Sequence, residues 1–425
     1  MIPIVRADTA PADALFARQL ARRGAHNEAV RHSVEGIVAE VRVGGWEAVR
    51  RFSLQFDGQE PYEVSSEQRA EAAARCDPAV RDALRRAAAR IRDYQMRLLT
   101  HSQEWECPGG GRAGVLVRGM ARVGLYVPGG TAAYPSSVLM NAVPATVAGV
   151  GELIMVTPPG AFLSPAVLAA ADIAGVHRVF AVGGAQAIAA LALGASPIPQ
   201  VDKIVGPGNA FVAEAKRQLY GQVDIDMVAG PSEVLVMADD SAPASYVAAD
   251  LLSQAEHDEL AASVLVTVSE KLAQEVASEL ARQVALLPRG HIARASLSQY
   301  GAVVVCESWR QGARIVNRIA PEHLEIMTEN PRGLLPLIQN AGAVFLGLYS
   351  PEPLGDYIAG PSHVLPTSGT ARFQSPLSCE SFLKKTSLIE YGPSHLEPLA
   401  RDIEALAQNE GLQAHATSVT MRFTP

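Results

Sequence analysis

The chain has 425 residues, of which 48% are apolar and 19% charged, a composition that excludes a disordered protein and allows two or three domains with large cores. The formal net charge is −8 and no dense run of Lys and Arg occurs, which argues against nucleic acid or an anionic membrane as a partner. No apolar run reaches membrane-spanning length without turn residues or charges.

The cysteines and the N-terminal residues indicate the compartment. Four cysteines are widely scattered and show no C-x-x-C spacing, which is typical of a reducing environment. The first residues, Met-Ile-Pro-Ile-Val-Arg-Ala-Asp, lack the charged start and apolar core of a signal peptide. We therefore expect a cytoplasmic protein.

The first hundred residues are predicted to be helical. Apolar residues recur at helical spacing over residues 27–42, and residues 78–100 carry a similar stripe. Residues 105–120, which surround Pro-Gly-Gly-Gly at 108–111, are predicted to form a loop.

Strands and helices then alternate. Strands are predicted at 122–127, 152–157, 178–182 and 203–205, each followed by a Gly- or Pro-rich turn and a helix. The alternation of strands and helices begins again after Pro231. Strands are predicted there at 234–237, 264–268, 302–306, 324–328 and 343–346, and helices include 271–287 and 309–319. This alternation predicts parallel sheets that are covered by helices on both faces.

The predicted fold class is therefore α/β, with two doubly wound units. Residues 121–230 form one unit, expected to bind a nucleotide. Residues 231–365 form the other, and the N-terminal helices (1–120) are expected to pack on it, which makes this unit discontinuous. Residues 366–425 are expected to form a small helical C-terminal region that contributes to a dimer contact.

Glycine-rich turns follow three strands of the 121–230 unit, at residues 128–130, 183–184 and 206–208. Ligands of such sheets bind beyond the carboxyl ends of the strands, where glycine lets the backbone approach closely and helix N-termini favour phosphate. The G-x-G-x-x-G fingerprint and an acidic ribose partner about 20 residues further on are both absent. A nucleotide site and plain tight turns both fit this pattern.

Several polar side chains could bind a metal. Gln254 and His257 lie three residues apart on a predicted helix and share a face. Asp356, in a Gly-rich segment, could supply a carboxylate, and with one further histidine this nitrogen and oxygen set suits zinc or another divalent metal. A solvated helix end and a loop-capping carboxylate fit the same residues.

An acid–base pair is predicted at the start of the 324–328 strand. Glu322 and His323 are adjacent there, and histidine is the natural base near neutral pH, although a solvated turn also fits. Ser232 lies at the junction of the two units and could donate a hydrogen bond; no G-x-S-x-G elbow makes it a nucleophile.

Three more residues could reach a site. His363 lies in the same Gly-rich segment as Asp356 and could contact substrate. Glu410 and His415 lie in a terminal helical stretch and could reach a site on a partner subunit. Loop capping explains His363 equally well, and a solvated terminal helix explains the other two.

Taken together, these segments resemble the histidinol dehydrogenase family. The matching motifs include Val-Gly-Gly-Ala-Gln-Ala-Ile at 182–188, Gly-Pro-Gly-Asn-Ala-Phe at 206–211, Ser-Gln-Ala-Glu-His at 253–257 and Pro-Glu-His-Leu at 321–324. Residues 123–135, 229–233, 355–357, 360–367 and 410–415 also match, so the resemblance runs from about residue 30 to the end.

The resemblance implies two incomplete Rossmann-like units and a reaction. The family oxidises L-histidinol to L-histidine through bound L-histidinal with two NAD, the last step of histidine biosynthesis. It also implies a homodimer with one zinc per subunit, whose ligands match Gln254, His257, Asp356 and His415. The partner subunit is expected to supply His415.

The resemblance also implies a role for each remaining residue. His323 matches the base that takes the hydroxyl proton, and Glu322 matches the base that activates water on the aldehyde. Substrate contacts match Ser232, His363 and Glu410, in addition to His323 and the four zinc ligands, and NAD contacts match Tyr126, Gln186 and Asn209.

Three other functions compete with this one. A relative with the same zinc and NAD machinery could oxidise a different alcohol, such as a sulfonated diol. A noncatalytic metabolite-binding paralogue would be expected to lose Glu322 or His323, and this chain keeps both. A metallohydrolase would explain the metal ligands but would leave the glycine-rich turns without a role.

Overall fold

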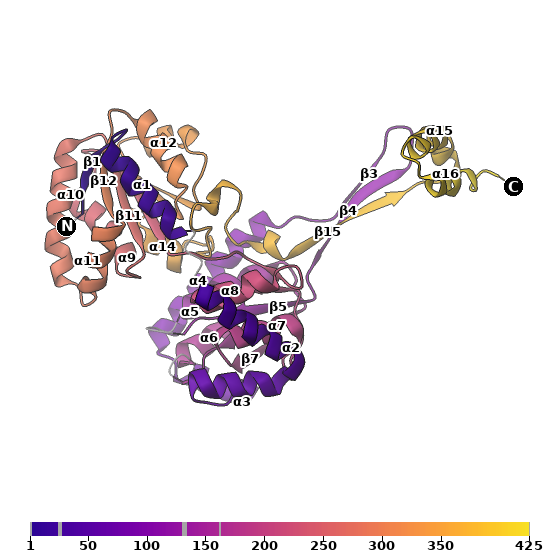
Figure 1. The fold of residues 1–425 in the computed structure, drawn as a ribbon, viewed down its shortest axis with the longest axis horizontal. Helices are drawn as coiled ribbons and strands as arrows, with labels where there is room; N and C mark the ends of the chain where they lie inside the picture. The colour runs from indigo at the N-terminus through magenta and orange to yellow at the C-terminus, as the bar shows by residue number, and fades with distance from the viewer. Residues whose placement is uncertain (1, 24–27, 130–133, 161–162, 425) are drawn as a thin grey trace.

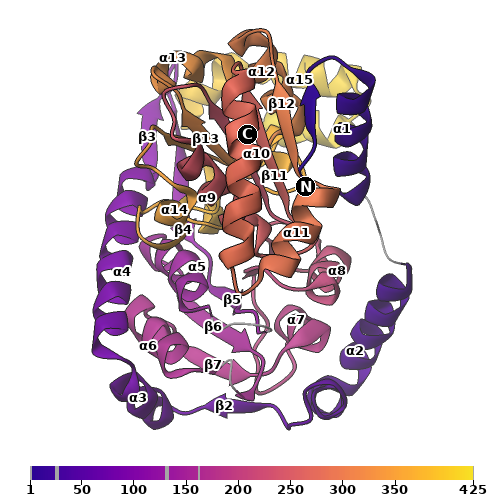
Figure 2. The same cartoon turned by 90° about the vertical axis from the view of Figure 1, so that its left-hand side faces the viewer.

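The computed structural model describes residues 2–23, 28–129, 134–160 and 163–424, which form two α/β bodies and a projecting arm (Figure 1). Figure 2 shows the two bodies one above the other, each built around its own sheet. In the described residues no helix combines the length and apolar character that a membrane span requires. The four cysteines are all free thiols.

The first sheet is parallel throughout and has the order β1-β12-β11-β10-β13-β14. Its strands are β1 (Ile4–Arg6), β10 (Glu233–Ala238), β11 (Ala262–Thr267), β12 (Ala302–Val305), β13 (His323–Met327) and β14 (Ala343–Leu346). One face packs on α9 (Ala244–Ala255), α10 (Glu270–Gln283) and α11 (Gly290–Gln299), and the other on α1 (Ala10–Arg23) and α12 (Trp309–Ile319). The short helices α13 (Pro331–Leu334) and α14 (Glu352–Tyr357) complete this body.

The second sheet has the order β2-β7-β6-β5-β8-β9 and is parallel except for its edge strand β2, which is antiparallel to β7. Its strands are β2 (Tyr62–Val64), β5 (Arg122–Tyr126), β6 (Glu152–Thr157), β7 (Arg178–Ala181), β8 (Lys203–Val205) and β9 (Asp224–Ile225). Helices α5 (Pro135–Val147) and α6 (Pro165–Ala174) cover one face, while α7 (Gly184–Leu193) and α8 (Ala210–Leu219) cover the other. The predicted α/β alternation is thus confirmed.

The N-terminal helices do not pack where the sequence predicts. Only β1 and α1 lie on the first sheet; α2 (Glu28–Asp57) packs on α7 and α8, α3 (Ser66–Arg75) packs on α6, and α4 (Pro78–Leu98) packs on α5 and α6. The prediction that these helices join the unit after Pro231 is therefore wrong. The reason is that α5 to α7 are buried almost all round, so they need a further layer of helices outside them. Periodicity identifies the buried face of a helix but not its partner.

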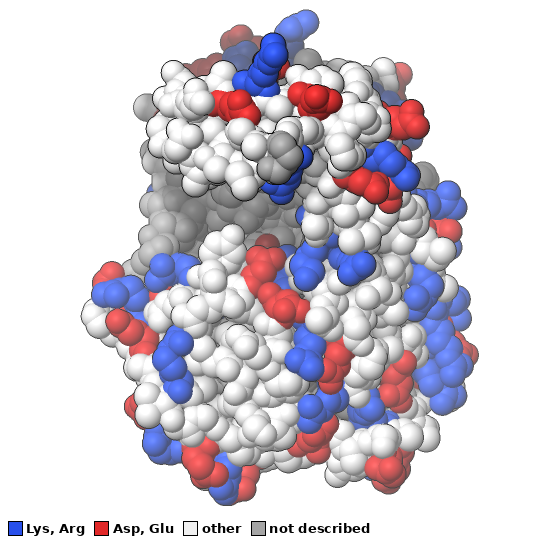
Figure 3. Space-filling view, turned by 90° about the vertical axis from the view of Figure 1, so that its right-hand side faces the viewer, with Lys and Arg blue, Asp and Glu red and all other residues white. Residues whose placement is uncertain are grey.

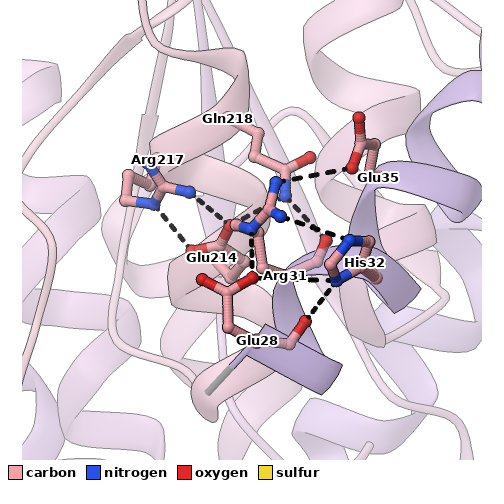
Figure 4. A network of polar contacts seen from close by, with 7 residues as sticks. All are labelled: Glu28, Arg31, His32, Glu35, Glu214, Arg217 and Gln218. Carbon is pink, nitrogen blue, oxygen red and sulfur yellow. Dashed lines mark hydrogen bonds and ion pairs between the residues drawn. The ribbon is translucent and has the colours of Figure 1, made fainter. Parts of the chain in front are cut away.

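A polar network fixes the start of α2 against α8 (Figure 4). The Nε2 of Gln218, on α8, donates to the carbonyl of Arg31, on α2, at 3.0 Å. Arg31 also pairs with Glu28 and Glu35 on its own helix. These contacts tie the outer helix to the helix that begins just after the glycine-rich turn at 206–208.

The arm is a second departure from the predicted structure. Residues 105–120, predicted as a loop, contain β4 (Arg112–Gly119) and part of β3 (Gln103–Glu106), and the predicted helical C-terminal region contributes β15 (Leu383–Glu390). The three strands form an antiparallel sheet in the order β15-β4-β3, because β15 supplies a partner that lies far away in sequence. Helices α15 (Pro393–Asn409) and α16 (Gln413–Thr420) lie at the tip, well away from both bodies (Figure 1).

Charges of both signs are interspersed on the face that Figure 3 shows, which looks along the arm from its tip. Neither blue nor red atoms form a continuous field across this face. Such a mixed surface lacks the electrostatic footprint of a nucleic-acid-binding face.

A buried ion pair holds the glycine-rich turn that follows β8. Lys216 pairs with Asp226, and their side chains are 2% and 1% exposed. Lys216 Nζ also donates to the carbonyl of Gly206 at 3.0 Å, and Asp226 accepts from the Gly206 N–H at 2.7 Å. Both peptide groups of Gly206 are therefore fixed by one pair of charges.

Removing one of these charges should destabilise the protein strongly. We expect Asp226→Ala to lower the free energy of unfolding by about 3–5 kcal/mol, because it leaves the Lys216 ammonium buried without its counter-charge. Urea denaturation measures the change. Asp93→Ala, at an exposed i,i+4 pair with Arg97, is the matched control and should change stability little. Equal effects of the two substitutions would show that burial of the pair does not matter.

Candidate active site

Polar side chains gather at the amino edge of the first sheet, where β10 and β13 begin side by side. Val234 lies opposite His323 in this parallel pair, so the residues just before the two strands are neighbours. Ser232 and Glu322 occupy those positions, and Glu322 and His323 are both buried. The structure thus brings Ser232, Glu322 and His323 together as the sequence predicts.

Backbone groups of Glu233 orient the predicted acid–base pair. His323 Nδ1 donates to the carbonyl of Glu233 at 3.2 Å, so the lone pair of the neutral ring is on Nε2. The described residues offer no hydrogen-bond partner to this buried Nε2. Glu322 Oε2 accepts from the Glu233 N–H at 3.0 Å. One peptide unit therefore holds both side chains in place.

Burial shifts both groups toward their neutral forms. It lowers the pKa of His323 to about 4, so the imidazole is an unprotonated acceptor at neutral pH. Burial also raises the pKa of Glu322 well above its ordinary value, and the hydrogen bond from Glu233 opposes this shift only in part. A carboxylate with a raised pKa is a stronger base once it is ionised.

The predicted metal donors face the same edge. Gln254 lies in the last turn of α9, but His257 lies in the turn beyond the helix, because α9 ends at Ala255; the prediction that the two share a helix face is therefore wrong. Asp356 lies on α14, where its Oδ1 is 3.9 Å from His323 Nε2. The Oε1 of Gln254 is buried and has no partner among the described residues. An orphaned amide oxygen, a histidine and a carboxylate fit a divalent metal such as zinc.

Sequence reasoning missed a chain of buried carboxyl groups behind these donors. Asp250 hydrogen-bonds Glu325, whose Oε1 accepts from the Glu352 N–H at 2.7 Å, and the Glu352 carboxyl in turn hydrogen-bonds Asp356. Burial raises the pKa of Glu325 to about 9 and that of Glu352 to about 8. A bound cation would offset this accumulation of carboxyl groups.

Glu352 is also one of three described residues that lie close enough together to ligate a metal. Ligand atoms of His323, Glu352 and Asp356 all lie within 4.8 Å of one another. The spacing of Glu352 and Asp356, four residues apart on one helix face, was a signal that could have identified it. Asp250 and Gln254 show the same spacing on α9.

His363 joins the two bodies at the site. Its Nδ1 donates to the carbonyl of Asp356 at 3.1 Å, and its Nε2 lies 3.3 Å from the hydroxyl of Ser137, at the start of α5. Burial lowers the pKa of His363 to about 4. The site thus adjoins the carboxyl edge of the second sheet, where α5 begins.

The predicted nucleotide contacts lie along that carboxyl edge, after β5, β7 and β8. The Tyr126 hydroxyl accepts from the Gly184 N–H at 3.2 Å, and burial raises its pKa to about 12. Gln186 is 1% exposed, and neither of its amide atoms has a partner among the described residues. Asn209 caps α8 by accepting from two backbone N–H groups.

The turns beside these residues require glycine, because the chain packs closely on itself there. Gly206 has φ of 112°, and a Cβ there would lie 2.1 Å from the carbonyl oxygen of Tyr126. A Cβ at Gly184 would lie 2.5 Å from Gln186 Oε1. Glycine turns at the carboxyl edge of a parallel sheet fit a nucleotide such as NAD. Of the predicted turn at 128–130, residue 130 lies outside the described residues.

Glu410 and His415 are the two predicted site residues that the chain does not bring to this edge. Both are exposed, at the end of α15 and on α16. Figure 1 shows these helices at the tip of the arm, far from α14 in the body.

Comparison with known proteins identifies the family. A family model described as histidinol dehydrogenase matches residues 20–423. The chain belongs to the histidinol dehydrogenase family. It is 50% identical over 400 residues to histidinol dehydrogenase of Bacillus cereus, covering 93% of each chain. It is also 50% identical over 403 residues to that of Bacillus subtilis, covering 94% of each chain.

The fold agrees with a solved structure of the same family. The crystal structure of histidinol dehydrogenase from Elizabethkingia anophelis aligns with a TM-score of 0.93 at 33% identity, covering 99% of this chain and 98% of that one. Membership of the histidinol dehydrogenase family thus extends over both bodies and the arm.

Proposed function

We propose that this protein oxidises L-histidinol to L-histidine through bound L-histidinal while reducing two NAD, the last step of histidine biosynthesis. The observation that carries the proposal is the unpartnered His323 Nε2 beside the buried carboxyl of Glu322, at an edge that also holds metal donors. A cytoplasmic location belongs to the proposal, since the reaction consumes NAD and the four cysteines are free thiols.

Each of the two bases has its own task. His323 Nε2 takes the proton of the substrate hydroxyl, and the Nδ1–H bond to Glu233 keeps the ring in the tautomer that can do so. Glu322 takes a proton from the water that adds to the aldehyde. The two oxidations need a proton acceptor twice and a water once, so adjacent bases can divide the work.

Other residues hold the substrate and the cofactors. Gln254, His257 and Asp356, with His415 of the partner subunit, would hold zinc, and Tyr126, Gln186 and Asn209 would hold NAD. Bound zinc supplies a charge that orients the imidazole and amino nitrogens of the substrate, and bound NAD accepts the hydride. Ser232, His363 and Glu410 of the partner subunit complete the contacts to substrate.

A homodimer is part of the proposal because the arm tip lies far from the site of its own chain (Figure 1). The tip also leaves large apolar side chains uncovered: Leu406 and Met421 are each 66% exposed, and Ile389 on the arm is 79% exposed. Seating this tip on a second copy would bury them and would deliver His415 and Glu410 to the partner's site.

Removing the metal should abolish the reaction. We expect NADH formation from L-histidinol to stop after dialysis against a chelator and to return on addition of zinc, since the substrate is no longer oriented without it. Absorbance at the NADH band measures both steps. A zinc-loaded protein that forms no NADH from L-histidinol but does so from a sulfonated diol would mean that another alcohol is the substrate. Full activity in the metal-free protein would contradict the proposed role of the donor set.

A further inference from the structure

Asp57 lies at the carboxyl edge of the second sheet although it comes from outside the sheet. It is the last residue of α2, and its carboxylate accepts a hydrogen bond from the Gly183 N–H in the turn after β7. It lies close enough to Tyr126, at the end of β5, for its charge to raise the pKa of that hydroxyl. Asp57 therefore stands beside two of the elements that form the nucleotide-binding edge.

The strand between these two contacts is β6. The sheet order places β6 between β5 and β7, with Tyr126 opposite Val156 and Ala181 opposite Thr157. In dinucleotide-binding folds an acidic residue about 20 residues after the glycine turn binds the adenosine ribose. Here β6 is followed by two prolines and a glycine, at 158–160, and supplies no acid. A carboxylate that bonds to the turn after β7 and lies near the end of β5 is close to the place where that acid is missing.

Unpartnered polar atoms lie on the same face of the sheet as α2. The Asp57 Oδ2 and both amide atoms of Gln186 are buried and have no hydrogen-bond partner among the described residues. Gln186 is 1% exposed. Buried groups of this kind are costly unless a ligand or water satisfies them. A ligand with vicinal hydroxyl groups offers donors to the carboxylate and acceptors to the amide.

We propose that Asp57 receives the adenosine ribose hydroxyls of NAD and that its negative charge excludes the 2′-phosphate of NADP. The inference rests on the proposed NAD-dependent function and names the residue that sets cofactor choice. A ribose diol donates to the free oxygen of Asp57, whereas a 2′-phosphate removes one donor and brings like charge to a half-buried carboxylate.

The test is direct binding of NAD and of NADP, measured by calorimetry on the zinc-loaded protein without substrate. We expect Asp57→Asn to weaken NAD binding about tenfold and to reduce the preference for NAD over NADP by at least about tenfold, since it removes a charged acceptor. The amide oxygen of asparagine can still accept from Gly183, so the melting temperature should stay the same. Asp57→Glu, which keeps the charge, should retain the preference for NAD.

Asp93→Asn is the matched control, because it removes one negative charge from an exposed pair on α4 and should leave both affinities unchanged. An Asp57→Asn variant with an unchanged ratio of the two affinities would overturn the inference, and a lower melting temperature in that variant would then mark Asp57 as a clamp between α2 and the Gly183 turn. Failure of the unsubstituted protein to bind NAD at all would instead overturn the proposed function.

Discussion

Replacing His323 by asparagine is expected to lower kcat for L-histidinol oxidation by about 10³-fold while zinc content and NAD affinity stay the same. The reason is that His323 Nε2 is an unpartnered imidazole nitrogen at the site, and asparagine has no group that takes a proton near neutral pH. Steady-state NADH formation gives kcat, and atomic absorption gives the zinc content.

His291→Asn changes an exposed histidine at the start of α11 and should leave kcat unchanged. Because His323 Nε2 lies 3.9 Å from Asp356 Oδ1, His323 could itself ligate a metal. Loss of zinc from the His323→Asn variant would therefore show that the residue is a ligand and would contradict its role as the base.

Replacing His415 by alanine is expected to reduce zinc content and to abolish activity while leaving the fold intact. His415 is exposed at the tip of the arm, so the substitution removes no buried contact within its own chain. Loss of one ligand should weaken zinc binding by at least about tenfold. Zinc content, activity and melting temperature are measured on the purified variant, and full zinc content would contradict the ligand assignment.

Mixed dimers test whether His415 acts across subunits. The His415→Ala chain lacks only the tip residue, and the His323→Asn chain lacks only the base in the body. If the tip serves the partner, a mixed dimer has one intact site, so random subunit exchange should restore about a quarter of the unsubstituted activity. If the tip serves its own chain, both sites of the mixed dimer are defective and no activity returns.

Strand and helix positions in the two bodies could be predicted because each element carries a local signal. The strands at 152–157, 203–205 and 343–346 and the helix at 309–319 agree residue for residue with the structure. Apolar strands and Gly- or Pro-rich turns are determined mainly by residues that are close in sequence, so a local residue pattern is enough to predict them. The family resemblance is likewise carried by short local motifs.

What could not be predicted depends on contacts between distant segments. Strand β4 pairs with β15, and more than 260 residues separate the paired Leu383 and Gly119. Helices α2 and α4 dock on the second body because the outer faces of α5, α6 and α7 are apolar and must be covered. The sequences of α5, α6 and α7 do not indicate which segment of the chain covers them. Glu325 and Glu352 form one hydrogen-bonded chain only because β13 and α14 meet.

In the candidate site, too, local sequence predicts some neighbours, whereas only the fold brings the others together. Gln254 and His257 are three residues apart at the end of α9, and Glu322 and His323 are adjacent, so each pair could be predicted locally. Their meeting with Asp356 and His363 is a property of the fold. The roles assigned to all of these residues, and the contribution of His415 from a partner, stay predictions until the variants are measured.

The count of NADH formed from limiting L-histidinol tests the central claim most directly. The zinc-loaded protein is expected to form about two NADH per L-histidinol, and Glu322→Gln is expected to form about one, because the aldehyde then lacks the base that activates water. Glu329→Gln, an exposed glutamate after the same strand, should still give about two. A yield of about one NADH from the unsubstituted protein would contradict the claim that a single site carries out both oxidations.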